Sequence, residues 1–426
     1  MGEFDYRKAR VELRQRIQEC IAGSGLSSKA VAGRIQLTEP TFSKILNNKQ
    51  SIRLKELDAL IGTLELPEED FYRHYIGECY QADADTRKLK LDRAREFVIT
   101  SYSKGYMELA NPLLSELLDI SKKNIRIIYD IAEELYEKQK FEAAKVLYRR
   151  VIQEETNLLA DHYSLSCFKY FLIMKSNIRE AYEPSIDLER HVEQLPTREW
   201  KIEAYFWLAK YSYVTEDWDR LRRMARGLIE VTYGYNEEMY GYGLLYLGFA
   251  VHRKKDFDEA IRLTYQYENI NLEFRDYAIG NRLIYLIDRG ETHYVPELIA
   301  YAKRLKVGQN AVRPIMSSYL NANMLKEAGE FLADISEYMS PFNQNDLILL
   351  KQYLHFYYLK AVYLLRIDER TQAVSDLLQA IEIAEKLNDY NLMKKCLYLF
   401  LENRQFTTTE QQEVVKLHVK GGDFPL

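Results

Sequence analysis

The sequence predicts an all-α protein, and three observations carry this prediction. Apolar residues recur at helical spacing, and strand-like alternation is not sustained in any segment. Only 18 Gly and 9 Pro interrupt the 426 residues. The long C-terminal part repeats itself at intervals typical of paired helices. With 47% hydrophobic and 29% charged residues, the chain has the composition of a folded protein rather than of a disordered one.

The composition also bears on compartment and cofactors. The four cysteines, at positions 20, 79, 167 and 396, form no CxxC pair, so neither a zinc site nor a redox pair is predicted. No run approaches the roughly 18 apolar residues of a membrane span, and no apolar segment follows a basic N-terminus. We therefore expect a cytoplasmic protein with reduced thiols, no membrane contact, no metal and no cofactor.

The charge is unevenly distributed along the chain. Residues 7–55 hold eleven Lys and Arg against three Glu, a net charge of +8. The rest of the chain therefore carries 48 bases and 61 acids, a net charge of −13, and the two parts give the overall −5. Because a binding partner feels the local field, the sequence indicates a small basic module attached to a large acidic body.

The basic module is predicted to fold as a bundle of short helices. Helix-capping residues precede two of them, Ser27 and Thr38, and Pro40 stands in a first turn, where a missing N–H has no cost. Two short helices joined by a tight turn are the arrangement that places one helix in the major groove of DNA. The expected helices span residues 11–21, 28–35, 39–46 and 54–64, with 39–46 as the recognition helix.

The stretch from Gly25 to Lys49 resembles the Cro/repressor-type helix-turn-helix family, whose spacing it matches. It departs from the pattern at Gln36, where Gly commonly fills the turn, and at Ser28, where Gln commonly opens the helix. Such a module can also serve only for dimerisation or protein docking. The DNA-facing residues are expected to be Ser28, Lys29, Thr38, Glu39, Thr41, Ser43, Lys44, Lys49 and Arg53.

The acidic body repeats a pattern of a bulky residue followed three positions later by a small or apolar one. The intervals between copies run from 31 to 45 residues, close to the 34-residue tetratricopeptide unit of two packed helices. A less regular helical solenoid is the alternative. The expected fold is thus an N-terminal helix-turn-helix domain followed by a tetratricopeptide-like α-solenoid. The anchor residues are Tyr106, Phe141, Ile178, Trp218, Phe257, Tyr294, Leu325 and Arg370.

A solenoid of this kind has an inner surface lined mainly by the first helix of each pair, and such surfaces hold extended peptides. The predicted inward positions are rich in Tyr, Arg and Asn, which suit a peptide backbone and a carboxylate. For any single Tyr, a half-buried packing position is the alternative. The candidate peptide-binding residues are Tyr170, Lys210, Tyr213, Tyr242, His252, Arg282, Arg313, Asn321 and Tyr358.

No pattern in the sequence predicts catalysis. The seven His are scattered without an HExxH motif, and Gly241 and Gly243 lie within a helix pattern rather than in a phosphate loop. The SxxK match at Ser101–Lys104 lies in a predicted helix without supporting motifs. We expect that the protein is not an enzyme.

The combination of these two parts resembles the peptide-pheromone (quorum-sensing) regulators of Gram-positive bacteria, the RRNPP family, over nearly the whole chain. The order of Glu69–Tyr75, Lys90–Val98 and about eight degenerate repeats is most like the arbitrium receptors of temperate phages of bacilli. The resemblance implies a cytoplasmic homodimer in a bacterial host cell. Its operator binding would be controlled by a short secreted oligopeptide and would govern the choice between lysis and lysogeny.

This resemblance also implies a domain organisation. Residues 1–66 would form the DNA-binding domain, 67–90 a linker helix, and 91–426 the peptide-binding and dimerisation domain. A host quorum-sensing regulator and a repeat-based interaction adaptor with a vestigial helix-turn-helix are the alternatives. The C-terminal apolar residues could make the dimer contact or cap the last repeat: Tyr398, Leu399, Phe400, Leu401, Val414, Val415 and Leu417.

Overall fold

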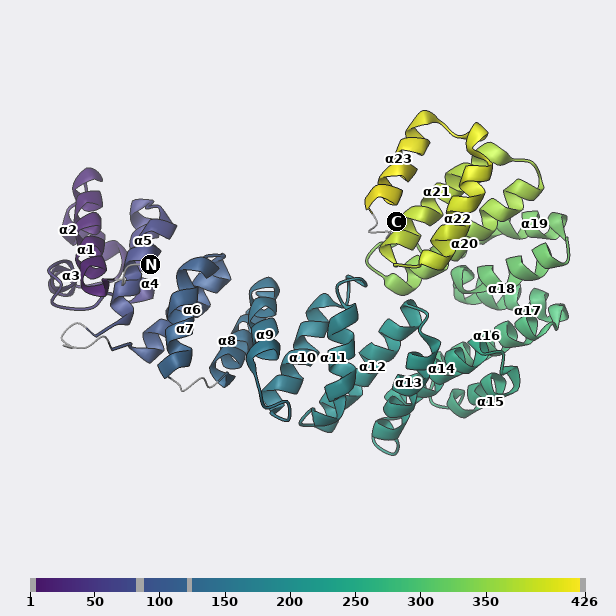
Figure 1. The fold of residues 1–426 in the computed structure, drawn as a ribbon, viewed down its shortest axis with the longest axis horizontal. Helices are drawn as coiled ribbons and strands as arrows, with labels where there is room; N and C mark the ends of the chain where they lie inside the picture. Colours follow the sequence, from purple (N-terminus) through teal and green to yellow (C-terminus); the bar gives the residue numbers. More distant parts are fainter. Residues whose placement is uncertain (1–4, 82–87, 121–124, 422–426) are drawn as a thin grey trace. The chain divides into compact units, whose positions relative to one another are not determined.

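The computed structural model describes residues 5–81, 88–120 and 125–421, and within these ranges the chain is all-α (Figure 1). The prediction of an all-α fold is confirmed. A single isolated bridge pairs Tyr80 with Leu89. The chain divides into two compact units, residues 1–173 and 174–426. In the described part, no helix combines the length and the apolar character needed to cross a membrane.

The first unit begins with five helices and a 3₁₀ turn. Asp5, Ser27 and Thr38 cap the first three helices through their side-chain oxygens, so the local capping chemistry sets where these helices begin. The elements are α1 (Tyr6–Gly23), α2 (Ser28–Arg34), α3 (Glu39–Leu46), α4 (Leu54–Leu64), α5 (Glu68–Tyr75) and η1 (Ile76–Cys79).

Helices α5 and η1 pack on α1. The approach is close, because a Cβ added at Gly77 would lie 2.6 Å from the Tyr6 carbonyl oxygen. The expected linker of residues 67–90 is therefore packed against the helix-turn-helix over its first half. Its residues 82–87 lie outside the described residues. The boundaries at 66/67 and 90/91 stay a prediction.

The first unit continues into helix pairs, which share one apolar core with the N-terminal helices. This core runs from Leu13 in α1 through Phe97 in α6 to Val151 in α9. The basic module and the first repeats are thus packed together rather than joined by an exposed tether. The helices are α6 (Leu91–Lys104), α7 (Met107–Ile120), α8 (Arg126–Glu137), α9 (Phe141–Glu154) and α10 (Asp161–Met174).

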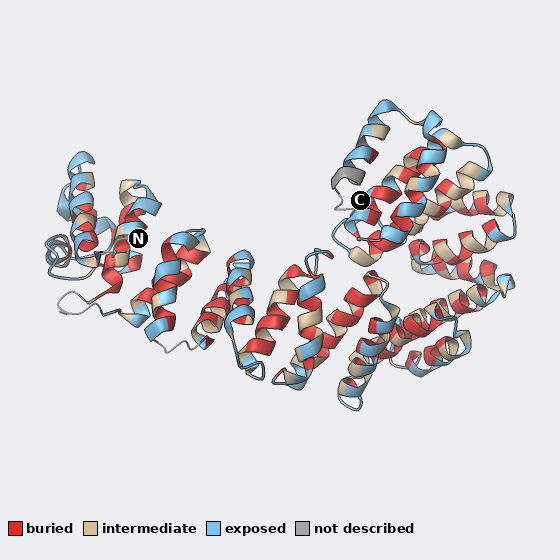
Figure 2. Cartoon of the chain, viewed as in Figure 1, coloured by how far each residue is buried: buried red, intermediate tan, exposed pale blue. Residues whose placement is uncertain are grey.

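The second unit is a run of antiparallel helix pairs in which successive helices up to the penultimate one contact one another, and the last helix packs on the helix two places before it. Buried residues lie along the sides where the helices face one another (Figure 2). Its helices are α11 (Tyr182–His191), α12 (Arg198–Val214), α13 (Trp218–Thr232), α14 (Glu237–Arg253), α15 (Phe257–Tyr267), α16 (Leu272–Arg289), α17 (Val295–Leu305), α18 (Gly308–Asn321), α19 (Leu325–Ile335), α20 (Leu347–Arg366), α21 (Arg370–Lys386), α22 (Tyr390–Glu402) and α23 (Thr409–Gly421). Three short 3₁₀ turns, η2 (Val192–Gln194), η3 (Thr292–Tyr294) and η4 (Arg404–Phe406), connect them.

Seven of the eight predicted repeat anchors mark where the second helix of a pair starts, whereas Ile178 lies four residues before α11 begins. Helices α9, α13, α15, α19 and α21 begin at an anchor residue, and Tyr106 and Tyr294 immediately precede α7 and α17. In the five pairs whose second helix begins at an anchor residue, the residue two positions before that anchor has a left-handed backbone. That conformation ends the first helix and turns the chain back. These residues are Gln139, Glu216, Lys255, Asn323 and Asp368.

The glycines of α14 are explained by packing. A Cβ at Gly241 would lie 2.7 Å from the Phe274 ring, and one at Gly243 would lie 2.7 Å from Ile229. Helix α14 therefore approaches both neighbouring pairs at distances that only Gly permits. This agrees with the prediction that these glycines belong to a helix.

Candidate functional sites: the recognition-helix surface and a cation-lined cavity

Helices α2 and α3 form a helix-turn-helix whose outer face is open to solvent. Phe42 and Ile45 anchor α3 in the core, and the turn before it is made by Gln36 with φ of 59°. Gln36 thus adopts the left-handed conformation for which Gly is usually chosen. The side-chain oxygen of Thr38 accepts a hydrogen bond from the Thr41 amide at 3.4 Å and fixes the start of the recognition helix.

The structure leaves most of the predicted DNA-facing residues open to solvent. Eight of them are exposed, and Thr41 is half-buried because its hydroxyl contacts that of Thr38 at 2.8 Å. Lys44 lies in the last turn of α3 and Lys49 in the loop that follows, so two cations flank the end of the recognition helix. This surface has the charge and the hydrogen-bonding groups required for phosphate and base-edge contacts.

Two of the basic residues in the charged segment do not face solvent. Arg10 and Arg14 are buried, each 3% exposed, and both contact the fully buried carboxylate of Glu78. The Arg10 Nε lies 3.1 Å and the Arg14 Nη1 2.6 Å from Glu78 Oε1, and the Arg93 guanidinium lies 3.8 Å from Oε2. The sequence-derived charge of +8 therefore overstates the charge presented to a partner.

The same cations hold the loop that follows the recognition helix. Arg14 donates to the carbonyl oxygens of Ile45 and Gln50 at 3.0 and 3.2 Å. Arg93, from α6, donates to the carbonyl oxygen of Ile52 at 2.8 Å. A cluster built on Glu78 thus connects α1, the loop after α3 and the first helix of the solenoid within the first unit.

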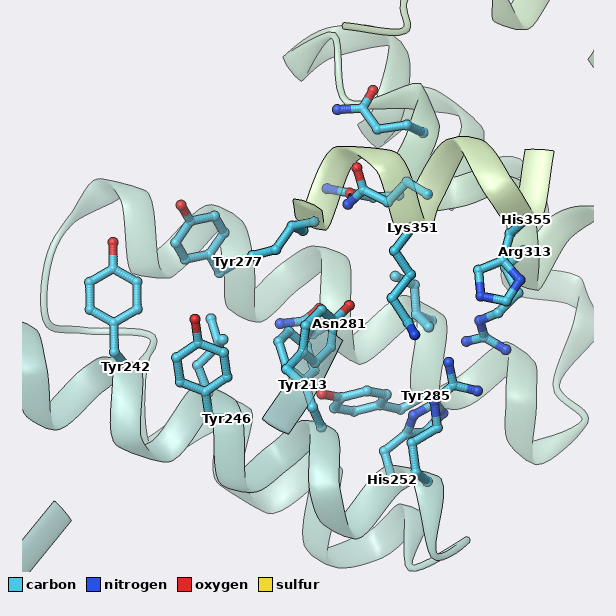
Figure 3. Close-up of a pocket in the computed structure, with 18 residues that line it drawn as sticks. Tyr213, Tyr242, Tyr246, His252, Tyr277, Asn281, Tyr285, Arg313, Lys351 and His355 are labelled. Carbon is cyan, nitrogen blue, oxygen red and sulfur yellow. Dashed lines mark hydrogen bonds between the residues drawn. The ribbon is translucent and has the colours of Figure 1, made fainter. Parts of the chain in front are cut away.

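The second unit contains a cavity of about 270 Å³ lined by the first helices of successive pairs, α12, α14, α16, α18 and α20 (Figure 3). Tyrosines and amides form much of its wall, and the cations Arg253, Arg313 and Lys351 line it together with His252 and His355. Of the described residues that line this cavity, none is acidic. The wall therefore offers hydrogen bonds to a peptide-like group and positive charge to an anion.

Acidic partners hold these cations from outside the lining. Asp288 accepts from Arg313 at 2.7 Å and lies 2.8 Å from Nε2 of His252. Burial opposes ionisation of Asp288, but the hydrogen bond with His252 and the charge of Arg313 outweigh it and hold the pKa of the carboxyl at about 2. Arg313 is thus fixed in orientation with part of its guanidinium toward the cavity.

Lys351 connects α20, the last of the helices that line the cavity, with α12, the first of them. Its ammonium lies 2.8 Å from a Glu216 carboxylate oxygen and donates to the Val214 carbonyl oxygen at 3.1 Å. Val214 ends α12, so this contact brings α20 against α12 on one side of the cavity. Burial lowers the pKa of Lys351, and its ion pair with Glu216 opposes that effect.

Two buried polar atoms of the cavity wall lack a hydrogen-bond partner among the described residues. They are the hydroxyl of Tyr285, a side chain that is 1% exposed, and Nε2 of His355. Burial and the nearby charges of Lys351 and Arg313 lower the pKa of His355 to about 3. Figure 3 shows Lys351 reaching from α20 toward Tyr285, and Arg313 beside His355. Because buried polar groups are normally hydrogen-bonded, these atoms are suited to receive a ligand.

The structure brings four of the nine predicted peptide-binding residues to this cavity: Tyr213, Tyr242, His252 and Arg313. Lys210 lines a different cavity. Arg282 is turned toward α15, where it donates to Thr264 and Glu268 and stacks 3.7 Å over the Tyr265 ring. Asn321 is exposed at the end of α18, Tyr358 packs on the core around Leu359, and Tyr170 packs on the core of the first unit.

Sequence reasoning missed Tyr246, Asn281, Tyr285 and Lys351. The signal was present, because each lies three or four positions from another lining residue and so on the same helix face. Arg282 shows the reverse error. It is one residue from Asn281, and a one-residue step rotates a side chain by about 100° around the helix. Which side of the first helix faces the cavity depends on how the helices pack, and the anchor residues alone do not specify this packing.

The C-terminal apolar residues are divided between surface and core. Tyr398, Leu401 and Leu417 are exposed, whereas Phe400 and Val415 are buried between the last helices. In the ranges that the structure describes, no cluster of three or more His, Cys, Asp or Glu could hold a metal ion.

Comparisons with known proteins identify the N-terminal part. Residues 16–75 match the family model of the Cro/C1-type HTH DNA-binding domain, which confirms the helix-turn-helix prediction. No curated protein matches the chain.

Several solved structures resemble the chain. NprR in complex with its cognate peptide NprX is 15% identical, with 71% of this chain and 90% of that chain covered and a TM-score of 0.41. A selenomethionine form of phAimR is 16% identical, with 94% and 99% covered and a TM-score of 0.39. Bacillus thuringiensis PlcR in complex with the peptide PapR7 and DNA is 16% identical, with 63% and 98% covered and a TM-score of 0.23.

Proposed function

We propose that this protein is a transcriptional regulator whose operator binding is controlled by a short peptide. The observation that carries the proposal is the combination, in one chain, of an exposed helix-turn-helix surface and a cation-lined, tyrosine-rich cavity in the helical repeats. The DNA-facing surface supplies Lys44 and Lys49 for phosphates and Thr41 and Ser43 for base edges. A regulator of this kind needs no catalytic group.

The peptide is proposed to bind in the cavity with an anionic group, a C-terminal carboxylate or an acidic side chain, near Arg313 and Lys351. The amides of Asn281 and Asn310 are suited to pair with its backbone. An anion at Lys351 competes with Glu216 and Val214 for the same ammonium. Peptide binding would thereby alter the contact between α12 and α20, and small rotations per repeat add along a solenoid.

Calorimetry on the full-length protein tests the peptide proposal. The probes are short synthetic peptides taken from the C-termini of short secreted proteins encoded beside the gene. We expect Arg313→Ala and Lys351→Met to weaken binding of the active peptide at least tenfold, roughly 1.4 kcal/mol or more. Arg282→Ala is the matched control, because its guanidinium is turned to α15 and should leave affinity unchanged. Equal losses in all three variants would contradict the placement in this cavity.

Operator binding separates this proposal from a repeat-based adaptor with a vestigial helix-turn-helix. A DNA-binding regulator releases counterions from phosphates, so its affinity falls steeply as salt rises. An adaptor would show no specific operator fragment in a selection from random or genomic DNA. The measurement is fluorescence anisotropy of a selected duplex at several salt concentrations.

We propose homodimerisation through the exposed apolar residues of the last helices. Tyr398 and Leu401 lie three positions apart on α22, so on the same side of the helix, and they are 62% and 60% exposed. Neighbouring exposed apolar side chains form a patch that a second copy could cover. Leu401→Glu should shift the mass measured by light scattering from dimer to monomer. An unchanged mass would assign these residues to the cap of the last repeat.

A role in a phage lysis–lysogeny decision is the finer proposal, and a host quorum-sensing regulator is its alternative. The two have the same architecture and differ in target genes. The location of the gene within an integrated phage genome, followed by a short gene for a secreted peptide, supports the first. A chromosomal location among host operons supports the second.

A further inference from the structure

The second unit has another cavity, of about 300 Å³, which the proposed peptide site does not include. It lies between the turn after α10, the C-terminal half of α12 and the loop that leads into α20. Its lining residues are Lys175, Ser176, Trp207, Lys210, Tyr211, Val214, Asn343, Asn345, Asp346 and Leu347.

The ammonium groups of two lysines lie over the indole ring of Trp207. The ammonium of Lys175 lies 4.5 Å and that of Lys210 lies 5.2 Å from the ring centroid. Each contact is favourable, since a cation is attracted to an aromatic face. Together they place two like charges on one ring in a partly buried cavity. Burial lowers the pKa of Lys175, Glu203 opposes this and Lys210 adds to it. An anion between the two ammonium groups would be attracted by both of them.

The acidic residue of the lining is already engaged. Asp346 caps α20, and one carboxylate oxygen accepts from the amides of Ile348 and Leu349 at 3.0 and 3.2 Å. The loop before it is held by two contacts, because Asn343 accepts from the Asn345 amide and Lys386 donates to the Gln344 carbonyl. The amides of the loop are thus presented on an ordered wall beside the two lysines.

The contact between α12 and α20 lies between this cavity and the first one. Val214 lines the second cavity, and its carbonyl oxygen accepts the hydrogen bond from Lys351, which lines the first. Lys210 and Tyr213 lie three positions apart on α12 and yet line different cavities. The contact between α12 and α20 therefore divides two positively charged spaces.

We propose that the cavity around Trp207, Lys175 and Lys210 is a second binding site, for a carboxylate-bearing ligand, and that it is separate from the first cavity. The carboxylate lies between the two ammonium groups, and a flat or apolar part of the ligand packs against the half-buried indole of Trp207. Asn345 and Ser176 supply hydrogen bonds to the rest of the ligand. The proposal does not depend on peptide control of DNA binding.

The three tryptophans allow a direct test. Trp200→Phe and Trp218→Phe leave Trp207 as the sole tryptophan of the full-length protein. Its emission is then titrated with N-acetyl-Glu-Glu, with N-acetyl-Gln-Gln and with citrate. We expect a saturable change with at least one carboxylate probe and at least tenfold weaker binding of the glutamine dipeptide. Preference for N-acetyl-Glu-Glu indicates a peptide source, and preference for citrate indicates a small free carboxylate.

Variants then separate the two cavities. Lys210→Met should weaken the carboxylate response about tenfold, Lys210→Arg should retain it, and Arg313→Ala, in the first cavity, should leave it unchanged. An unchanged circular dichroism spectrum shows that Lys210→Met is folded. If Lys210→Met does not fold, Lys210→Arg still tests the proposal, because a folded protein with Arg at this position should retain the response. Equal responses to the glutamine and glutamate dipeptides, no saturable response, or loss of the signal in Arg313→Ala would overturn the proposal.

Discussion

The guanidinium of Arg14 donates to the Glu78 carboxylate at 2.6 Å, and both side chains are buried. Arg14 lies in the first helix and Glu78 in the 3₁₀ turn that follows the helix-turn-helix. This pair ties the position of the recognition helix to the start of the repeats, since Arg14 also holds the carbonyl oxygens of Ile45 and Gln50.

Glu78→Gln should destabilise the first unit by roughly 3–5 kcal/mol, because it leaves the buried guanidinium groups of Arg10 and Arg14 without their counter-charge. Urea denaturation of the full-length protein, followed by circular dichroism, measures this change. Glu69→Gln is the control, because its pair with Arg73 is 57% exposed on both sides and such pairs contribute less than about 1 kcal/mol. A loss below 1 kcal/mol in Glu78→Gln would show that the cluster is not a stabilising centre.

Gln36→Gly should raise the stability of the first unit by about 0.5–1 kcal/mol, because Gln36 holds a left-handed backbone with φ of 59°. Chemical denaturation measures the effect. Gln15→Gly, at an exposed position inside α1, should have the opposite sign and cost about 1 kcal/mol. The same sign in both variants would mean that the turn conformation is not the cause.

The stability of the second unit should fall as pH drops from about 6.5 to about 3. In the unfolded chain the imidazole of His355 takes up a proton near pH 6.5, whereas burial and the charges of Lys351 and Arg313 keep its pKa at about 3 in the folded protein. The unfolded state therefore binds more protons throughout that window, and the loss of stability is on the order of 5 kcal/mol.

His355→Gln should flatten this pH dependence, which thermal unfolding at several pH values would show. His293→Gln is the matched control, because His293 is exposed on η3. A profile of His355→Gln that follows that of the unaltered protein would assign the pH dependence to other groups.

Lys49→Ala should weaken operator binding and reduce the slope of log affinity against log salt by about 0.9, the contribution of one phosphate contact. Anisotropy titrations at several salt concentrations give this slope. Lys138→Ala, which removes an exposed ammonium paired with Glu134 on α8, should leave the slope unchanged. An equal change in both variants would indicate a general effect of net charge.

The predicted and observed inner surfaces differ, and the difference shows which features helical periodicity can predict. Anchors such as Phe141, Trp218 and Phe257 mark where second helices begin, because turn chemistry and the spacing of small residues are local properties. The rotation of each first helix about its axis is not local. Arg313 faces the cavity and Arg282 does not, although both were predicted from the same register.

The sequence by itself determined the all-α fold, the helix-turn-helix and the repeats, since each depends on spacing, capping and charge within a few dozen residues. Only the tertiary structure decided that Arg10 and Arg14 are buried on Glu78, and that Lys351 meets Val214 across 137 residues. It also decided that Trp207 and Lys210 line a separate cavity. These relations join residues far apart in the chain, so they follow from how the helix pairs stack and are not encoded in any local pattern.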